Sequence, residues 1–432
     1  MRKKANADPS THHPQAEVRL GPRSLRMTLR FFCNSLKVSR LLRMRAVFFC
    51  CVVSGLVVGA KAQEIVLTNP VDVDRGQEVV EVPLAQVVQE MHLTTAQVSS
   101  LTAYDAGTGE RIPDQIYASK PDTPADLLLL LVHLSAHGRL RVKLRVEPNA
   151  SAQPTRVFGR EAPERKDDFA WENQQVAYRI YGPALQATGE ITSGIDVWSK
   201  RVPNFVIDSF YKRDAEGART HNPALSYHID NGVGLDSYLV GLTRGCGGTA
   251  VFSSGKLIVS NNYTTMRILA NGPIRFSALV GYAPWDANGV SVTESKRITL
   301  DAGTHMNRID STYTFDRVGP LELAAGIAVH EGAAAEFPVG GSVASVWDTP
   351  QLASAGRIAT GLIAAPGQHA RTVAAPGHAL IVFTRHSGES FSYLAGSGWS
   401  KADMPTADDW KAYLMLEKKK MEHPIEVSWK RR

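Results

Sequence analysis

Residues 274–300, IRFSALVGYAPWDANGVSVTESKRITL, carry the clearest structural pattern in the chain. Two strand-like segments, 278–282 and 291–298, flank the tripeptide Ala287-Asn288-Gly289. An Asn-Gly pair is typical of tight hairpin turns, because both residues readily adopt positive φ. The stretch therefore predicts two long antiparallel strands joined by a hairpin.

Comparable strand patterns continue through the chain from residue 64 onward. Leu127–Val132 is an unbroken apolar run, as expected for a strand buried on both faces. Leu140–Val146 alternates apolar with basic residues, as expected for a half-exposed strand. The other clear strands are predicted at 64–67, 79–82, 101–104, 175–181, 194–198, 257–260, 263–269, 306–315, 326–330, 379–384 and 391–394.

A single long helix is predicted near the C-terminus. Thr406 and Asp409 form a capping box. Trp410, Tyr413 and Leu414 follow at helical spacing, and Pro424 ends the helix before a last strand at 425–429. So many strands with so little helix predict an all-β protein, built mainly as a large antiparallel sandwich.

The domain organisation follows from composition. Residues 63–148 are predicted to form a small N-terminal β domain, and 166–432 the main domain. Between them, 149–165 is poor in apolar residues and contains Pro154 and Pro163, so it is predicted to be a linker.

The N-terminus predicts export. Residues 44–62, MRAVFFCCVVSGLVVGAKA, combine a positive start, a short apolar run and a small-x-small cleavage pattern ending at Ala62. We expect a bacterial protein, periplasmic or secreted, that is cleaved near Ala62 and whose true start is Met44 or Met27. The run is shorter than the roughly 20 residues of a membrane span, so none is expected after cleavage. A genuine long leader or a transit peptide is the alternative for residues 1–62.

The formal charge of +6 arises entirely in this segment. Residues 1–62 hold 12 Lys/Arg and 2 Asp/Glu, which leaves 36 cations and 40 acids in the rest of the chain. The overall charge therefore gives no support for nucleic-acid binding, and no such partner is expected. Of four cysteines only Cys246 follows residue 62, so no internal disulfide is expected.

The densest group of polar residues lies between Asp196 and Arg244. His228 in this group can act as a general base or acid near neutral pH. Asp230 or Asp236 could orient His228, or the carboxylates could share the acid and base roles. Its arginine, in a glycine-rich turn, could bind an anion or pair with Asp236. A surface loop whose polar groups satisfy its own turns is an equal alternative. The candidate catalytic residues are His228, Asp230, Asp236, Tyr238 and Arg244.

Sugar sites combine flat aromatic faces with carboxylates and cations, which hold hydroxyl and uronate groups. For Trp171, a place in the core is the stronger alternative, and the turn 398–401 could be a simple connection. The candidate substrate-binding residues are Trp171, Trp198, Lys200, Arg201, Asp208, Tyr211, Trp399 and Lys401.

No cofactor is predicted. Asp230, Asn231 and Asp236 offer oxygen ligands that would suit Ca²⁺, but the acidic residue that closes an EF-hand loop is absent. The chain shows no zinc-ligand spacing, and its lack of a P-loop, of a GxGxxG after a strand and of a GxSxG disfavours nucleotide enzymes and the usual serine hydrolases.

Several motifs resemble those of the secreted bacterial family described as domain of unknown function 4861. They span nearly all of 64–430: RKDDFAWEN (165–173), YGPA (181–184), SGIDVW (193–198), Tyr227-His228 with Gly234-Leu235-Asp236, RGCGG (244–248), NGPIR (271–275) and GWSK (398–401). The resemblance implies a galactose-mutarotase-like β-supersandwich, a fold shared by sugar epimerases, polysaccharide lyases and domains of glycoside hydrolases. It also implies an association with the breakdown of uronate-containing polysaccharides, but fold analogy does not assign a reaction.

We therefore expect an exported enzyme that acts on uronate-containing poly- or oligosaccharides. In a lyase, Arg244 or Lys200 would neutralise the carboxylate, and His228 or Tyr238 would move the proton. In a glycoside hydrolase, two of Asp208, Asp230 and Asp236 would share the acid and base roles. The alternatives are a non-catalytic periplasmic glycan-binding protein and, more weakly, a structural envelope protein. The sequence leaves the sugar, the linkage and the oligomeric state open.

Overall fold

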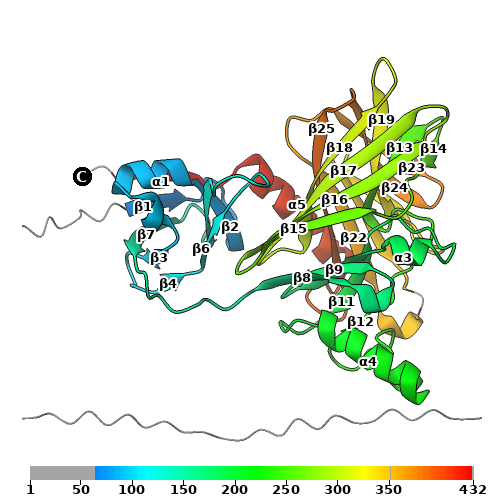
Figure 1. The fold of residues 1–432 in the computed structure, drawn as a ribbon, viewed down its shortest axis with the longest axis horizontal. Coiled ribbons are helices and arrows are strands. Elements are labelled where there is room, and N and C mark those ends of the chain that lie inside the picture. Colours follow the sequence, from blue (N-terminus) through cyan, green and yellow to red (C-terminus); the bar gives the residue numbers. More distant parts are fainter. Residues whose placement is uncertain (1–63, 351, 431–432) are drawn as a thin grey trace, which may run out of the picture. The chain divides into compact units, whose positions relative to one another are not determined.

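The computed structural model describes residues 64–350 and 352–430 (Figure 1). The predicted signal segment lies outside these residues. The described chain is mostly β-strand, and the strands pair antiparallel in five sheets. The prediction of an all-β protein is confirmed, whereas the galactose-mutarotase-like arrangement stays a prediction from the resemblance. Within the described ranges, no helix has both the length and the apolar character that a bilayer crossing needs.

Two sheets form around the N-terminal region. The first sheet has the order β26-β1-β7-β3-β4 and the second the order β2-β6-β5. The strands are β1 (Glu64–Thr68), β2 (Arg75–Pro83), β3 (Leu101–Asp105), β4 (Arg111–Ile112), β5 (Asp114–Tyr117), β6 (Leu127–Leu134), β7 (Arg139–Val146) and β26 (Glu426–Trp429). Helices α1 (Leu84–Met91) and α2 (Thr95–Val98) connect β2 to β3.

Strand β6 explains the apolar run at 127–132. Leu128 and Leu130 pack into the core of the first two sheets. Leu129 and Leu131, on the opposite face, pack into the core of the main sheets. Both faces of β6 are therefore buried, as the sequence predicts.

Three further sheets share the largest core. The third sheet has the order β12-β11-β10-β9-β8, the fourth β14-β13-β19-β24-β23, and the eight-stranded sheet β15-β16-β17-β18-β25-β22-β21-β20. Their strands are β8 (Val157–Ala162), β9 (Asp168–Asn173), β10 (Val176–Ile180), β11 (Asp196–Lys200), β12 (Gly234–Leu235), β13 (Cys246–Ser253), β14 (Lys256–Ile258), β15 (Thr265–Asn271), β16 (Arg275–Asp286), β17 (Ser291–Asp301), β18 (Met306–Phe315), β19 (Leu321–Ala328), β20 (Ala335–Val339), β21 (Val343–Asp348), β22 (Ile358–Ala364), β23 (Ala370–Ala375), β24 (His378–Arg385) and β25 (Ser390–Trp399).

The predicted hairpin at 274–300 is confirmed. β16 and β17 pair antiparallel along most of their length. Asn288 and Gly289 adopt φ of 58° and 82° in the turn between them, as an Asn-Gly turn requires. The predicted linker 149–165 contains β8, which pairs with β9.

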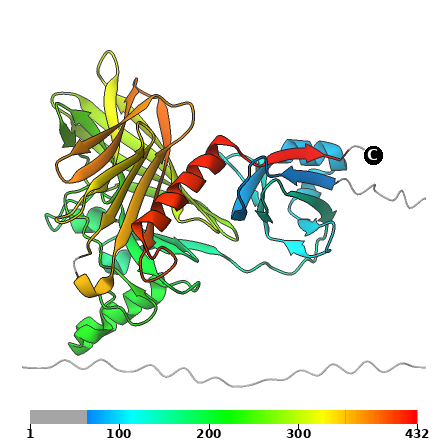
Figure 2. The ribbon, with the colours of Figure 1, turned by 180° about the vertical axis from the view of Figure 1, so that it is seen from behind.

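The predicted C-terminal helix and strand are also confirmed. α5 (Ala407–Glu422) begins after Thr406, whose hydroxyl accepts from Asp409 N at 3.1 Å, and the Asp409 carboxylate accepts from Thr406 N at 3.0 Å. β26 then pairs with β1, so the first sheet contains both ends of the described chain (Figure 2).

The prediction of only one long helix is wrong. α4 (Ile207–Thr220) packs Ile207 and Phe210 against the face of the third sheet that carries Trp198. Its N-cap position is Val206, which cannot cap a helix with its side chain. The buried Glu172 carboxylate on β9 accepts instead from the N–H groups of Val206 and Ile207 at 2.8–2.9 Å.

Candidate functional site

The third sheet positions a group of buried charged residues on the face that α4 covers. Arg179 on β10 pairs in register with Asp196 on β11. Asp168, on β9, points to the same face, since side chains alternate along a strand. Asp236 reaches the group from the segment that follows β12. We call Arg179, Asp168, Asp196 and Asp236 the acid cluster.

Arg179 is the centre of the acid cluster. Its Nη2 lies 2.5 Å from Asp196 Oδ2 and 3.0 Å from Asp236 Oδ2, and its Nη1 lies 3.4 Å from Asp168 Oδ2. All four side chains are buried. Three buried carboxyls share this one guanidinium, and unbalanced buried charge is costly, which favours the protonated form within the cluster.

The pKa values of two carboxyls reflect this. Burial raises the pKa of Asp168 to about 6, against the opposing effect of Arg179. Burial, together with the neighbouring Asp196, raises the pKa of Asp236 well above its usual value. Strongly shifted carboxyls in close contact are typical of functional sites, although structural networks also produce them.

Aromatic rings enclose the acid cluster on the α4 side. The Arg179 guanidinium lies 4.9 Å from the ring centre of Tyr181 and 5.2 Å from that of Trp198. Tyr227 and Tyr211 pack on Trp198, and the Tyr211 hydroxyl donates to Asp168 at 3.3 Å. These rings are buried apart from Tyr181, which is partly exposed.

His228 lies at the exposed edge of the acid cluster, because its ring contacts Asp236. Its side chain is 54% exposed, and its Nδ1 lies 2.9 Å from the backbone oxygen of Asp236. Because a carbonyl only accepts hydrogen bonds, Nδ1 carries the proton of the neutral ring, and Nε2 keeps a lone pair. The structure thus presents a basic ring nitrogen above a buried acid group.

The structure does not bring all the predicted catalytic residues together. His228 and Asp236 meet, but the Tyr238 hydroxyl donates to Gly245 O at 3.0 Å, inside the core. The buried Arg244 donates to Ser193 Oγ at 3.1 Å and Thr249 O at 3.2 Å. The suggested pair of Arg244 with Asp236 is wrong, because Asp236 binds Arg179. Burial lowers the pKa of Arg244 to about 10.

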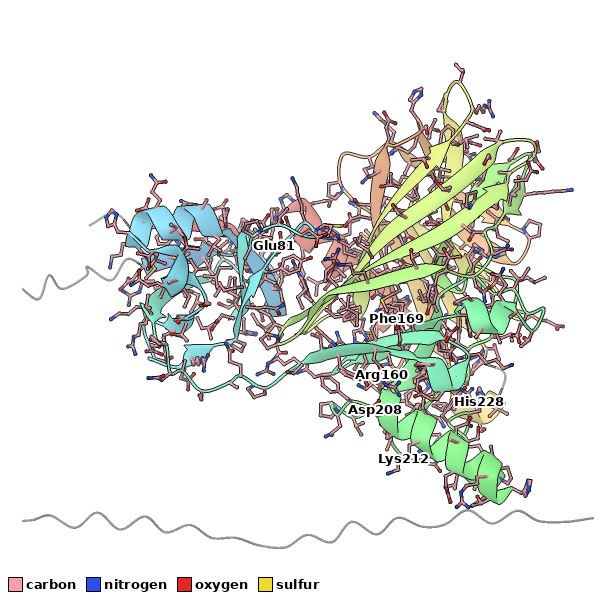
Figure 3. The ribbon with its side chains drawn as sticks, viewed as in Figure 1. Glu81, Arg160, Phe169, Asp208, Lys212 and His228 are labelled. Carbon is pink, nitrogen blue, oxygen red and sulfur yellow. The ribbon has the colours of Figure 1, made fainter. Side chains whose placement is uncertain are left out.

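Most predicted substrate-binding residues are inaccessible. Trp171, Trp198 and Tyr211 are buried, and their rings leave no face for a sugar in this conformation. Lys200 is buried 2.7 Å from Glu172. Asp208, on α4, is accessible: its side chain is 71% exposed and pairs with Arg160 on β8 at 2.6 Å (Figure 3).

Of the remaining predicted residues, Arg201 and Lys401 lie at the surface and Trp399 is buried. Arg201 pairs with Asp230, and its guanidinium lies 4.5 Å from the ring centre of Trp399 and helps to cover that ring. Lys401 donates to the backbone oxygen of Ser354. The Arg201 side chain remains 31% exposed.

The residues suggested for Ca²⁺ are engaged otherwise. Asp230 binds Arg201 and accepts from Gly232 N at 2.9 Å, and Asp236 binds Arg179. Across 64–350 and 352–430, no group of three or more His, Cys, Asp or Glu side chains is arranged to hold a metal ion.

A small cavity of about 280 Å³ borders the predicted segment and is lined by Ser237, Tyr238, His330 and Asp348. His330 Nδ1 lies 2.5 Å from Asp348 Oδ2, and Nε2 lies 2.7 Å from Leu239 O. Both partners are acceptors, so both ring nitrogens are protonated, in line with the raised pKa that the Asp348 hydrogen bond gives His330. The pair thus ties the loop after β12 to β21.

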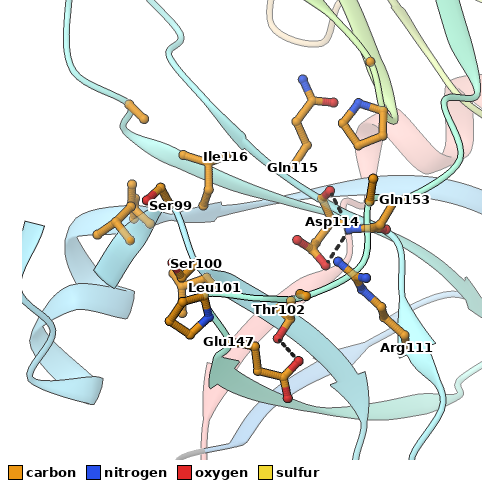
Figure 4. A pocket seen from close by; sticks show the side chains of 18 of the residues that line it. Ser99, Ser100, Leu101, Thr102, Arg111, Asp114, Gln115, Ile116, Glu147 and Gln153 are labelled. Atoms are coloured by element: carbon orange, nitrogen blue, oxygen red, sulfur yellow. Dashed lines mark hydrogen bonds between the residues drawn. The ribbon is translucent and has the colours of Figure 1, made fainter. Parts of the chain in front are cut away.

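A much larger cavity, of about 1010 Å³, lies beside the first sheet and contains none of the predicted residues (Figure 4). Size alone would make it the default binding site. Among the described carboxyls, however, the largest upward pKa shifts are those of Asp168 and Asp236 in the acid cluster.

The acid cluster predicts an unusual pH dependence of stability. The folded-state pKa of Asp168, about 6, lies above the ordinary value of 3.8. Between these pH values the folded chain holds a proton that the unfolded chain releases, so the stability from that proton is lost as pH rises. Asp168→Asn, which cannot ionise, should make the slope of unfolding free energy against pH less negative by up to about 1.4 kcal/mol per pH unit.

Urea unfolding at pH 4, 5 and 6 measures this slope. Asp316→Asn, at an exposed aspartate, serves as the control. Equal slopes for the Asp168 and Asp316 variants would show that Asp168 does not hold the proton.

The fold and site define an all-β protein with a buried arginine–carboxylate cluster under one histidine. Residues 67–427 match the family described as a domain of unknown function (DUF4861), and the chain belongs to this family. It is 30% identical over 381 residues to uncharacterized protein P7 of Formosa agariphila, covering 84% of this chain and 92% of that protein.

Two solved structures from Enterococcus faecalis are similar at 11% identity and a TM-score of 0.48, over 86% of this chain. One is an alpha-mannosidase of strain V583, and the other is a protein in the glycosyl hydrolase family 38. The chain spans about half the length of each, 46% and 48%.

Proposed function

We propose that the protein is an exported carbohydrate-active enzyme that cleaves uronate-containing poly- or oligosaccharides by β-elimination. The observation that carries the proposal is the His228 ring, whose Nδ1–H is held by the Asp236 carbonyl while Nε2 stays basic on a half-exposed side chain. Such a nitrogen can remove the proton next to the uronate carboxylate.

Arg201 is the cation best placed to neutralise that carboxylate. It is held by Asp230, two residues after His228, and it is partly exposed, unlike Lys200 and Arg244. A uronate could replace Asp230 as the partner of its guanidinium, which binds carboxylates in a bidentate manner.

The elimination balances with these two groups. His228 Nε2 takes the proton, the C–H electron pair forms the new double bond, and the C–O bond to the departing sugar breaks. The same imidazolium then returns its proton to the departing oxygen, so the enzyme ends unchanged.

Hydrolysis has less support. It needs two carboxyl groups that flank the glycosidic bond. Asp236 is only 3% exposed and binds Arg179, while Asp208 and Asp230 bind Arg160 and Arg201.

Incubation of the purified protein with uronate-containing and neutral oligosaccharides tests the proposal. Elimination yields ultraviolet absorbance of the unsaturated product together with new reducing ends. Reducing ends without absorbance would indicate hydrolysis instead. If both signals were absent across a broad panel of substrates, the result would contradict an enzyme of either kind.

A non-catalytic glycan-binding protein is the second candidate. The observation that favours it is the internal pairing of the acid cluster, whose three carboxyls all contact Arg179. Binding of the same oligosaccharides without either product signal would support this candidate.

A further inference from the structure

The first sheet buries one face and leaves the other open. Leu140, Val142, Leu144 and Val146 of β7 face the core that the first two sheets share. The alternate residues Arg139, Arg141, Lys143 and Arg145 therefore all point to the open face. Arg141 and Arg145 are 50% and 46% exposed.

Strand register extends this basic column sideways. Lys143 pairs with Glu64 on β1 and with Tyr104 on β3, and Tyr104 pairs with Arg111 on β4. All of these residues point to the open face, as does Lys430, which follows β26 and contacts Glu64. We call this surface the basic face.

The charge of the basic face is positive overall. It holds six cations, Arg111, Arg139, Arg141, Lys143, Arg145 and Lys430, and three carboxylates, Glu64, Glu147 and Glu426.

Its ion pairs are long. Arg141 lies 3.4 Å from Glu64 and Arg145 lies 3.7 Å from Glu147, whereas strong charged hydrogen bonds measure about 2.7–2.9 Å. Among the described residues, Arg139 and Lys143 have no carboxylate within ion-pair distance. The cations are therefore available to an external anion.

The geometry suits an extended chain. Alternate residues on a strand are about 6.6–6.8 Å apart, so the four cations of β7 form a column about 20 Å long. The Arg145 guanidinium lies over the Tyr104 ring, 4.4 Å from its centre, which helps to hold Arg145 in the column. A linear polymer with regularly spaced anionic groups can contact several of these cations at once.

The basic face borders the 1010 Å³ cavity. Arg111 and Glu147 belong to the basic face and also line the cavity, as does the buried Thr102, which pairs with Arg145 (Figure 4). Arg111 Nε is buried there without a hydrogen-bond partner among the described residues. A bound polymer can thus place one unit in the cavity while its neighbours contact β7.

We propose that the basic face binds an acidic polysaccharide chain, at a site separate from His228. The choice of an acidic glycan rests on the proposed function. Sequence-independent binding of single-stranded nucleic acid uses several aromatic platforms, whereas Tyr104 is the only aromatic residue of this face within the described chain.

Binding to polygalacturonate and to chondroitin sulfate at low salt, with dextran as the neutral polymer, tests the proposal. The variant Arg139→Gln/Arg141→Gln/Lys143→Gln should weaken binding of an acidic polymer at least tenfold. The control Lys212→Gln/Lys256→Gln/Arg317→Gln removes three exposed cations elsewhere and should bind like the wild type. Wild-type binding should also weaken as salt is added.

Equal binding by the two triple variants, or no binding of either acidic polymer by the wild type, would overturn the proposal. Single-stranded DNA is tested in the same way. If it binds the wild type as tightly as the polysaccharides do, and binds the variant Arg139→Gln/Arg141→Gln/Lys143→Gln equally less tightly, the choice of an acidic polysaccharide as the ligand is overturned. The variant His228→Asn should bind the acidic polymers as tightly as the wild type. A loss of binding that is confined to Arg139→Gln/Arg141→Gln/Lys143→Gln would therefore support the basic face even if no elimination activity is detected.

Discussion

Arg179→Met is expected to destabilise the fold by about 3–5 kcal/mol, because it leaves three buried carboxyls without their shared cation. Methionine fills a similar volume, so lost packing contributes little. Urea unfolding at pH 7.5, followed by tryptophan fluorescence, measures the effect.

Arg371→Met is the matched control. Arg371 pairs with Glu322 at 2.6 Å, but both side chains are well exposed. Exposed pairs contribute about 0–1 kcal/mol, so this variant should change stability far less.

The loss in Arg179→Met should depend on pH in a defined direction. The pKa values of Asp168 and Asp236 are already raised by burial, and without Arg179 they rise further. At pH 5 these carboxyls are protonated at less cost than at pH 7.5, so the destabilisation should be smaller at pH 5. A loss of the same size at both pH values would show that charge burial is not its cause.

The sequence predicted much of the fold because the decisive patterns are local. Asn288-Gly289 specifies a turn through its own φ angles. Thr406 and Asp409, only three residues apart, together cap the start of α5. The run at 127–132 indicated burial on both faces without saying what covers each face. The structure supplies that information, since Leu128 and Leu129 belong to different cores.

Helix α4 escaped prediction because its cap is not local. The N-cap position, Val206, has no capping side chain, and the cap comes from Glu172, which lies in β9. A signal was nevertheless present. Ile207, Phe210 and Tyr211 stand at helical spacing, and Asn222-Pro223 marks a stop.

The acid cluster was only partly predictable for the same reason. Of the cluster, Asp236 was predicted as a catalytic candidate, together with the adjacent His228, because the two lie eight residues apart in one polar segment. Arg179 was missed, because its contact with Asp196 depends on the register of β10 with β11, which no local pattern reveals. The available signal was a lone charged residue inside the apolar segment 176–180, since a buried cation needs a partner.

His228→Asn is expected to lower kcat for β-elimination by about 10²–10⁴-fold, the usual contribution of a positioned acid–base group. The asparagine amide can still donate to the Asp236 carbonyl, as Nδ1 does. It has no basic nitrogen to replace Nε2. The variant therefore separates base catalysis from the structural hydrogen bond, and KM and the urea midpoint should stay close to the wild-type values.

His133→Asn provides the matched control, because His133 is an exposed histidine on β6. It should leave kcat unchanged. If His228→Asn kept more than a tenth of the wild-type kcat at an unchanged urea midpoint, His228 would not be the base. If it lost activity only in proportion to lost stability, its role would be to hold the loop after β12 rather than to move a proton.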